Sequence, residues 1–189
     1  MEVSSTKTFE VGADIHFVWS VLSDPQQVVV CVPGAHLTEV LDEDHFKGKV
    51  ILKIGLVTAK FNGEVEITQR DSSTYEMAME GKGADSSGKG GATMIMSLSL
   101  KALKESTEVT CIMSVSITGR IAQFGARMIE AVNNKLFEQF IQNFCNLLLQ
   151  ENGEVATGPN SLEAEPVKAA SLIGSVIISE LKKKLVKKI

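Results

Sequence analysis

The sequence predicts one α+β domain in which an antiparallel sheet is followed by a single long helix. Three observations lead to this prediction. Alternating strand patterns separated by turn-rich clusters fill residues 35–117. Short helical patterns precede them, and a helical period without proline fills residues 120–150. Too few helices separate the strands for a parallel sheet, so the strands form an antiparallel meander that can curve around the long helix and leave a cavity between the two.

The first predicted elements are a strand and two short helices. Apolar residues alternate along residues 3–11, although Lys7 interrupts the pattern. Asp14 stands where an N-cap is expected, directly before an apolar helical stretch. Asp24-Pro25 starts the second helix, because proline is favoured at the first helical position, and Pro33-Gly34 ends it. The two short helices are therefore predicted to lie between the first strand and the remaining strands of the sheet.

The following strands and the long helix have clear boundaries. Turn-rich clusters divide about six strands at residues 42–45, 70–73, 83–91 and 103–107. After Gly119 the period changes, and one helical stripe is predicted to lie on the sheet. Its members are Ile121, Phe124, Met128, Val132, Leu136, Phe140 and Phe144.

The glycine-rich segment GKGADSSGKGGA at residues 81–92 resembles a phosphate-binding loop in part. Gly83, Gly88 and Lys89 fit the spacing, but Gly90 stands where serine or threonine must hold magnesium. The segment also leads into the alternating stretch ATMIMSLSL rather than into a helix, whose N-terminus would bind the phosphate. We therefore predict a hairpin turn with glycines at positive φ and bulges that bend the sheet.

Other chemistry-bearing residues show no site pattern. Histidines 16, 36 and 45 share no ligand-like spacing with one another or with the cysteines, so no metal and no cofactor is predicted. Cys31, Cys111 and Cys145 lie in apolar surroundings and are expected to be small buried hydrophobes without disulfides. No catalytic serine or cysteine signature occurs. A non-enzymatic function is the expectation.

The methionines suggest a ligand-binding wall. Residues two apart on a strand share a sheet face, and thioethers suit both irregular cores and apolar cavities that accept varied ligands. Plain core packing and a cavity lining both remain open on this evidence. The candidate lining residues are Met77, Met79, Met94, Met96, Met113, Phe124, Met128 and Val132.

Charge separates a C-terminal tail from the body. Residues 167–189 hold six lysines and one glutamate, net +5, whereas residues 1–166 carry net −9, which argues against a nucleic-acid-binding core. Residues 1–150 are predicted as the domain, 151–166 as a polar linker and 167–189 as a basic amphipathic helix. Its candidate membrane-binding residues are Ile177, Leu181, Leu185, Ile189, Lys182, Lys183, Lys184, Lys187 and Lys188.

Two interpretations of the tail stay open. It is either an interfacial helix that docks reversibly on an anionic membrane, with an attraction that salt weakens, or a terminal helix that packs on protein. No stretch approaches the roughly 20 apolar residues of a membrane span, and the N-terminus lacks a signal-peptide pattern. A cytoplasmic protein, peripheral on the inner face of the membrane, is expected.

Several segments together resemble the family of the carbon monoxide dehydrogenase G subunit, within the polyketide cyclase, START and birch-allergen-like superfamily (SRPBCC). The similarity covers about residues 3–148. The segments that carry it are Asp24-Pro25, CVPG at 31–34, FKGKVILKIG at 46–55, FNGEVEI at 61–67, GKGADSSGKGGA at 81–92 and SITGRIAQFGARMI at 116–129.

The resemblance implies a helix-grip fold, with about seven antiparallel strands curled around the C-terminal helix and an apolar cavity between them. It implies a non-catalytic carrier of quinone-like or lipid ligands that recruits a molybdenum hydroxylase, such as carbon monoxide dehydrogenase, to the membrane. Two alternatives remain: a structural or assembly partner of a multisubunit oxidoreductase without a ligand, and a small-molecule cyclase or hydrolase on the same fold. The tail stands where family members often contact the membrane, but it is short and cationic.

Overall fold

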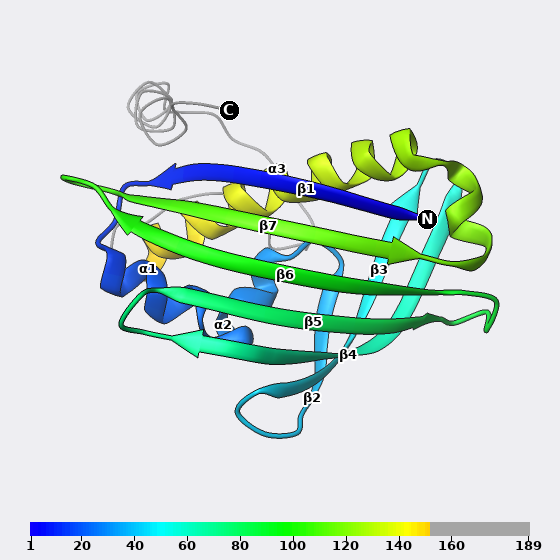
Figure 1. The fold of residues 1–189 in the computed structure, drawn as a ribbon, viewed down its shortest axis with the longest axis horizontal. Helices are drawn as coiled ribbons and strands as arrows, with labels where there is room; N and C mark the ends of the chain where they lie inside the picture. The colour runs from blue at the N-terminus through cyan, green and yellow to red at the C-terminus, as the bar shows by residue number, and fades with distance from the viewer. Residues whose placement is uncertain (152–189) are drawn as a thin grey trace, which may run out of the picture.

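The computed structural model describes residues 1–151, arranged as one curved sheet with helices on its concave side (Figure 1). The predicted α+β fold, with a curved antiparallel sheet and a long C-terminal helix, is confirmed. The elements are β1 (Glu2–Val11), α1 (Ile15–Leu22), α2 (Pro25–Val28), η1 (Val29–Cys31), β2 (Ala35–Val40), β3 (His45–Ile54), β4 (Val57–Asp71), β5 (Glu76–Asp85), β6 (Gly91–Ala102), β7 (Thr107–Ile117), η2 (Gly119–Phe124) and α3 (Ala126–Glu151).

The sheet has the strand order β1-β7-β6-β5-β4-β3-β2, and every neighbouring pair is antiparallel. Strands β2 to β7 therefore form the predicted meander, and β1 joins it at the far edge by pairing with β7. Val3 lies opposite Val115 and Phe9 opposite Val109. Because side chains alternate between the two faces of a sheet, this register directs one apolar set toward α3.

Strand β4 bends, which lets the sheet wrap around α3. The strand is 15 residues long, and its pairing with β5 shifts between Ile67 and Gln69, as at a β-bulge. At Gly63 an added Cβ would overlap the carbonyl oxygen of Lys82 in β5, so only glycine fits where β4 passes this close to β5. The first part of β4 and the strands β3 and β2 consequently pass behind the rest of the sheet in Figure 1.

Both N-terminal helices begin at the predicted caps. The carboxylate of Asp14 accepts a hydrogen bond of 2.8 Å from the backbone N–H of His16. Asp24 accepts one of 2.9 Å from Gln26, and Pro25 occupies the first turn. Each cap satisfies a helical N–H that has no partner within the helix. Gly88 in the turn between β5 and β6 has φ of +70°, so the predicted hairpin turn is also confirmed, whereas the predicted bulges are not found, because the pairing of β5 with β6 has no register shift.

The long helix begins later than the sequence predicts. Residues Gly119–Phe124 form the 3₁₀ helix η2, and Gly125 follows with φ of +78°, a conformation that interrupts the helix before α3 starts at Ala126. The predicted stripe is therefore corrected at its start. In α3 the buried residues are Ile129, Ile141, Phe144 and Leu148. Of the predicted stripe, Ile121 and Phe144 are buried, Met128 is exposed, and the other members are half-buried.

The core divides into two clusters of buried side chains. The first cluster joins β1, α1, the middle strands and the C-terminal part of α3, and includes Phe9, Trp19, Leu100, Val109 and Phe144. The second cluster lies at the other end of the sheet and comprises Val3, Ile54, Ala59, Ile117, Ile121 and Ile129. Sheet and helix are thus closed against each other at two ends.

Candidate functional site

Five methionines lie close together on the concave face of the sheet. Met79 in β5 pairs with Met96 in β6, and Met96 pairs with Met113 in β7. Met77 and Met94 are each two residues from a member of this row and share its face. We call these five residues the methionine band. The sequence identified each of them as a candidate, and the strand register brings them together.

The methionine band is buried at one end and partly exposed at its other margins. Met77 is 4% exposed and belongs to the first cluster, and Met79 and Met96 pack half-buried at the edge of that cluster. Met94 and Met113 are half-buried and belong to neither cluster. In a filled core all five side chains would be buried. The band therefore leaves apolar, adaptable surface between sheet and helix, which suits a hydrophobic ligand.

The three candidates from the helical side lie in different places. Phe124 in η2 and Val132 in α3 are half-buried against the second cluster, at one end of the methionine band. Met128 is 42% exposed, so it does not join the methionines of the sheet. The reason is the break at Gly125, because α3 starts anew at Ala126. In this helix Ile129 points toward the sheet, and Met128 lies about 100° around the helix axis from it.

A small polar group faces the methionine band from β1 and α3. Ser5 pairs with Met113, and the amide of Asn133 in α3 donates a hydrogen bond of 3.0 Å to the Ser5 hydroxyl. Lys7 pairs with Cys111, shares the face of Ser5 and is half-buried. None of the ion pairs among residues 1–151 involves Lys7. One hydroxyl, one amide and one ammonium group thus lie beside an otherwise apolar wall.

The sequence pattern treated Lys7 as an interruption of the strand and so missed its position. The period of two was itself the signal, because Lys7 is two residues from Phe9 and four from Val3, and both of these are buried. Lysine can place its apolar stem along such a wall while its ammonium group reaches a polar partner. The group can therefore donate to a carbonyl or anionic oxygen of a ligand.

The described part of the chain offers binding groups rather than activated nucleophiles. Burial raises the pKa of the Cys31 and Cys111 thiols to about 11, with a further contribution at Cys31 from Cys145. Burial also raises the pKa of Cys145. These thiols are therefore protonated at neutral pH and poorly reactive. Within residues 1–151, no cluster of three metal-ligating side chains occurs.

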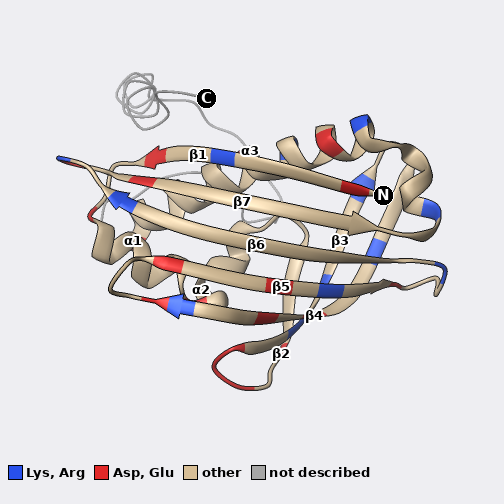
Figure 2. Ribbon diagram, in the orientation of Figure 1, with Lys and Arg blue, Asp and Glu red and all other residues tan. Residues whose placement is uncertain are grey.

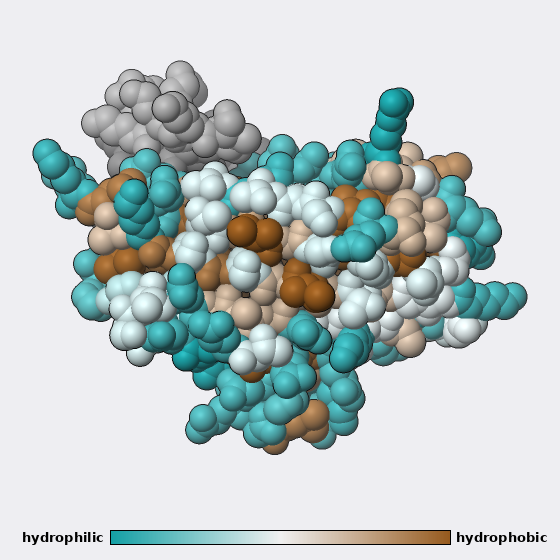
Figure 3. All heavy atoms as spheres, in the orientation of Figure 1, coloured by the Kyte–Doolittle hydropathy of each residue, from teal (hydrophilic) through white to brown (hydrophobic). Residues whose placement is uncertain are grey.

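A separate hollow of about 610 Å³ lies on the convex face, where β4 to β7 come together near their glycines (Figure 3 views this face). Its lining mixes charged and hydroxyl side chains, such as Glu64, Lys82 and Thr93, with the backbone of glycines. It is wide open to solvent, so it suits a hydrophobic ligand less well than the methionine band does. We therefore take the band and its polar group as the candidate site.

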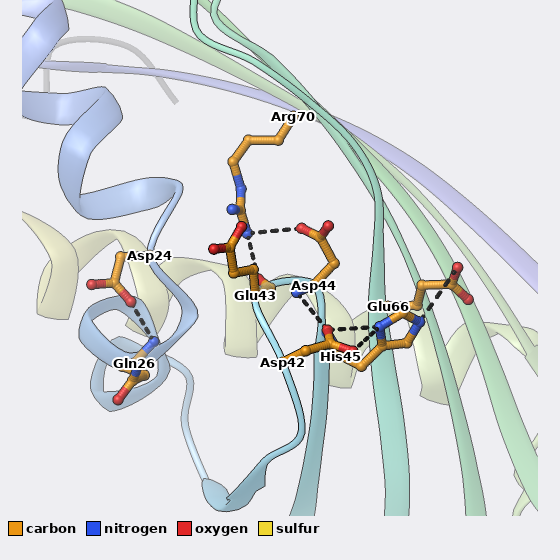
Figure 4. Close-up of polar contacts among 8 residues, drawn as sticks. All are labelled: Asp24, Gln26, Asp42, Glu43, Asp44, His45, Glu66 and Arg70. Carbon is orange, nitrogen blue, oxygen red and sulfur yellow. Dashed lines mark hydrogen bonds and ion pairs between the residues drawn. The ribbon is translucent and has the colours of Figure 1, made fainter.

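The turn between β2 and β3 is an exposed polar cluster at the edge of the fold (Figure 4). His45 Nδ1 lies 2.8 Å from Oδ1 of Asp42, and Nε2 lies 3.8 Å from Glu66. Beside it, Arg70 donates to the carbonyl oxygen of Glu43 at 3.0 Å and pairs with Asp44 at 3.3 Å. These contacts hold the turn against β4.

The pKa of His45 lies above its ordinary value, chiefly because Asp42 accepts its hydrogen bond and secondarily because of the nearby negative charges. The stability that this contact gives the turn is present below the unfolded pKa of about 6.5 and is lost as pH rises through the folded pKa. NMR titration of His45 measures its pKa in the folded protein. Asp42→Asn should lower the pKa clearly, and Glu66→Gln should lower it less. An equal effect of both variants would contradict this order of causes.

The candidate membrane-binding residues of the tail, from Ile177 to Ile189, lie outside the described residues, as does the predicted tail helix. The predicted linker lies outside them from residue 152 onward, and its first residue, Glu151, is the last residue of α3. Within the part that the structure describes, none of the helices is long and apolar enough to cross a bilayer. The proposed role of the tail therefore remains a prediction from its sequence.

Comparisons with known proteins assign this chain to a family. The family model of the carbon monoxide dehydrogenase G subunit (CoxG) matches residues 8–148. A conserved protein from Geobacillus kaustophilus, of known crystal structure, has a TM-score of 0.71 at 24% identity, and the match covers 79% of this chain and 97% of that chain. Among curated proteins, none matches the sequence.

Two further solved structures share the fold. The ZhuI aromatase/cyclase from Streptomyces sp. R1128 has a TM-score of 0.60 at 14% identity, over 84% of this chain and 100% of that chain. A START superfamily protein from Mycobacterium smegmatis has a TM-score of 0.57 at 14% identity, over 78% of this chain and 98% of that chain. The predicted START-like helix-grip fold is thus confirmed. Sequence identities this low do not show that these proteins share a function with this chain.

Proposed function

This chain belongs to the carbon monoxide dehydrogenase G-subunit (CoxG) family, and from that membership and the methionine band we propose that it is a non-catalytic carrier of a hydrophobic ligand. In this proposal it recruits a molybdenum hydroxylase, such as carbon monoxide dehydrogenase, to the membrane. The observation that carries the proposal is that Met94 and Met113 are half-buried and belong to neither of the two core clusters. Family and fold support ligand binding or cyclase-like chemistry, and the absence of an activated nucleophile among the described residues favours binding.

The chemistry of the site suits an apolar molecule with a carbonyl-bearing head, such as a quinone. The thioethers contact the apolar part and adapt to its shape. Lys7, Ser5 and Asn133 can donate hydrogen bonds to an oxygen at the head. A lipid with a polar headgroup satisfies the same requirement, so the proposal covers quinone-like and lipid-like ligands.

Lys7→Met tests the polar part of this proposal. The variant keeps the apolar stem and removes the ammonium group, so the affinity for decylubiquinone, measured by calorimetric titration, should fall about tenfold, because a hydrogen bond from a charged group contributes about 1.5–3 kcal/mol. Binding of decylbenzene, which has no carbonyl, should not weaken. Lys101→Met, at the exposed end of β6, is the matched control and should bind like the wild type. Equal affinity of Lys7→Met and wild type for decylubiquinone would remove Lys7 from the site.

Membrane recruitment through the tail is tested by co-sedimentation with anionic liposomes. The full chain should bind more tightly than residues 1–166, and added salt should reduce the difference, because each lysine near an anionic surface contributes about 1 kcal/mol that ions screen. Equal binding of both forms at low salt would exclude the tail from recruitment.

The alternative of an assembly partner without a ligand is favoured by one feature of the convex face. Ile95 and Ile112 are 58% and 52% exposed there, among hydroxyl side chains such as Ser97 and Ser114. Figure 3 shows brown areas in the middle of this face, next to white areas of intermediate hydropathy. Exposed apolar residues that lie next to one another on a sheet face are typical of protein contacts. A ligand-free chain that still binds its partner enzyme would favour this alternative.

A further inference from the structure

Three connections meet at one end of the folded body, at the right in Figure 1. They are the turn between β3 and β4, the turn between β5 and β6, and the segment from β7 to α3. The backbone N–H of Ser86 donates to Lys60 at 2.8 Å, and that of Thr118 donates to Gly91 at 2.9 Å, so each connection is tied to the next. We define residues 53–60, 82–91 and 118–130 as the loop end.

The tip of the loop end is an apolar side chain that no residue of the described part of the chain buries. Leu56 has a relative exposure of 106%, and Gly55 before it has φ of +60°, which forms the tight turn that projects it. Met128, at the start of α3, is 42% exposed on the same end. A leucine held this far into water at a hairpin tip gives the fold no burial energy, so it is available to a partner.

The loop end carries a net positive charge, although the folded body as a whole is acidic. It holds six basic residues and two acidic ones, net +4, whereas residues 1–151 as a whole carry thirteen basic and nineteen acidic residues, net −6. The remainder of the described chain therefore carries net −10. Figure 2 shows several basic segments at this end, further ones at the opposite end of the sheet, and acidic segments in the turn between β2 and β3. The six basic residues are all exposed: Lys53, Lys60, Lys82, Lys89, Arg120 and Arg127.

We propose that the loop end is a docking surface for an anionic lipid bilayer. An exposed leucine surrounded by cations fits the interface of such a bilayer, where the leucine enters the acyl boundary and the cations meet the headgroups. Docking in this way would direct the second cluster, and behind it the methionine band, toward the membrane. The surface is distinct from the tail, because it belongs to the folded body.

This inference rests on the proposed function in one respect: docking serves the protein only if the ligand is exchanged with the bilayer. The two can nevertheless fail separately. Affinity for decylubiquinone in vesicle-free solution tests the ligand site, and contact of Leu56 with lipid tests the docking surface.

A tryptophan at the tip reports the contact directly in the full chain. Leu56→Trp is compared with Leu103→Trp, because Leu103 is an exposed leucine between Lys101 and Lys104 at the opposite end of the sheet. The vesicles contain phosphatidylglycerol and phosphatidylcholine in equal parts, and brominated lipid serves as the quencher. We expect a blue shift and quenching of the emission for Leu56→Trp alone. No change at position 56, or an equal change at both positions, would overturn the proposal.

Charge reversal provides an independent measurement. Lys53→Glu with Lys60→Glu should weaken binding of the full chain to these vesicles about tenfold or more, whereas Lys101→Glu with Lys104→Glu, the same charge change at the opposite end, should leave it within about twofold. Both double variants should bind decylubiquinone in solution like the wild type. Equal loss of vesicle binding by both would show a general electrostatic attraction and would overturn a defined docking surface.

Discussion

Met113→Trp should lower the affinity for decylubiquinone about tenfold or more while leaving the fold stable. Met113 lies at the β7 edge of the methionine band, opposite Met96 and Ser5, and is half-buried outside both core clusters. A larger ring at this position occupies the surface that the ligand needs. In a filled core the same change would overpack and cost about 1–3 kcal/mol, whereas the proposed ligand site would accommodate the extra atoms.

The neighbouring residue supplies the matched control. Ile112→Trp introduces the same ring one position away on β7, where the side chain is 52% exposed on the convex face. Calorimetric titration should show wild-type affinity for this variant, and urea denaturation should show that both variants remain folded. Loss of stability without loss of affinity in Met113→Trp would mean that the methionine band is ordinary core.

Phe144→Ala should destabilise the protein by about 3–5 kcal/mol, which is a large part of the roughly 5–15 kcal/mol that stabilises a typical domain. Phe144 is fully buried in the first cluster, where it anchors α3 against the concave face. Its ring stacks on Phe140 with a centroid separation of 5.7 Å and an interplanar angle of 5°. Removing the ring leaves a cavity that the sheet and helix cannot fill.

The free energy of unfolding in urea measures this loss, with Leu56→Ala as the control. Leu56 contacts no core residue, so its truncation should change stability by less than about 0.5 kcal/mol. A loss below about 1 kcal/mol for Phe144→Ala would mean that α3 does not depend on the first cluster for its position.

Most of the fold could be predicted from the sequence because its signals are local. Asp14 and Asp24-Pro25 fixed the helix starts, and the turn clusters with the apolar alternation fixed the strands. The start of α3 could not be found in this way. The residues before Gly125 satisfy a helical period as well as those after it, and only the positive φ at Gly125 separates η2 from α3.

The candidate site was predictable in composition but not in arrangement. The methionines stood out by type and spacing, yet the row from Met79 to Met113 depends on pairing between strands, which no short stretch of sequence contains. Lys7 was misjudged because a charged residue in a strand is usually assigned to solvent. The hydrogen bond between Asn133 and Ser5 joins residues 128 positions apart, and only the folded chain brings them together.

Native mass spectrometry of the full chain after exposure to a bacterial lipid extract tests the central claim most directly. We predict that the wild type retains a hydrophobic molecule from the extract, that Met113→Trp retains much less of it, and that Ile112→Trp retains it like the wild type. An intact wild-type protein that retains nothing, or equal retention by all three proteins, would contradict a ligand site at the methionine band.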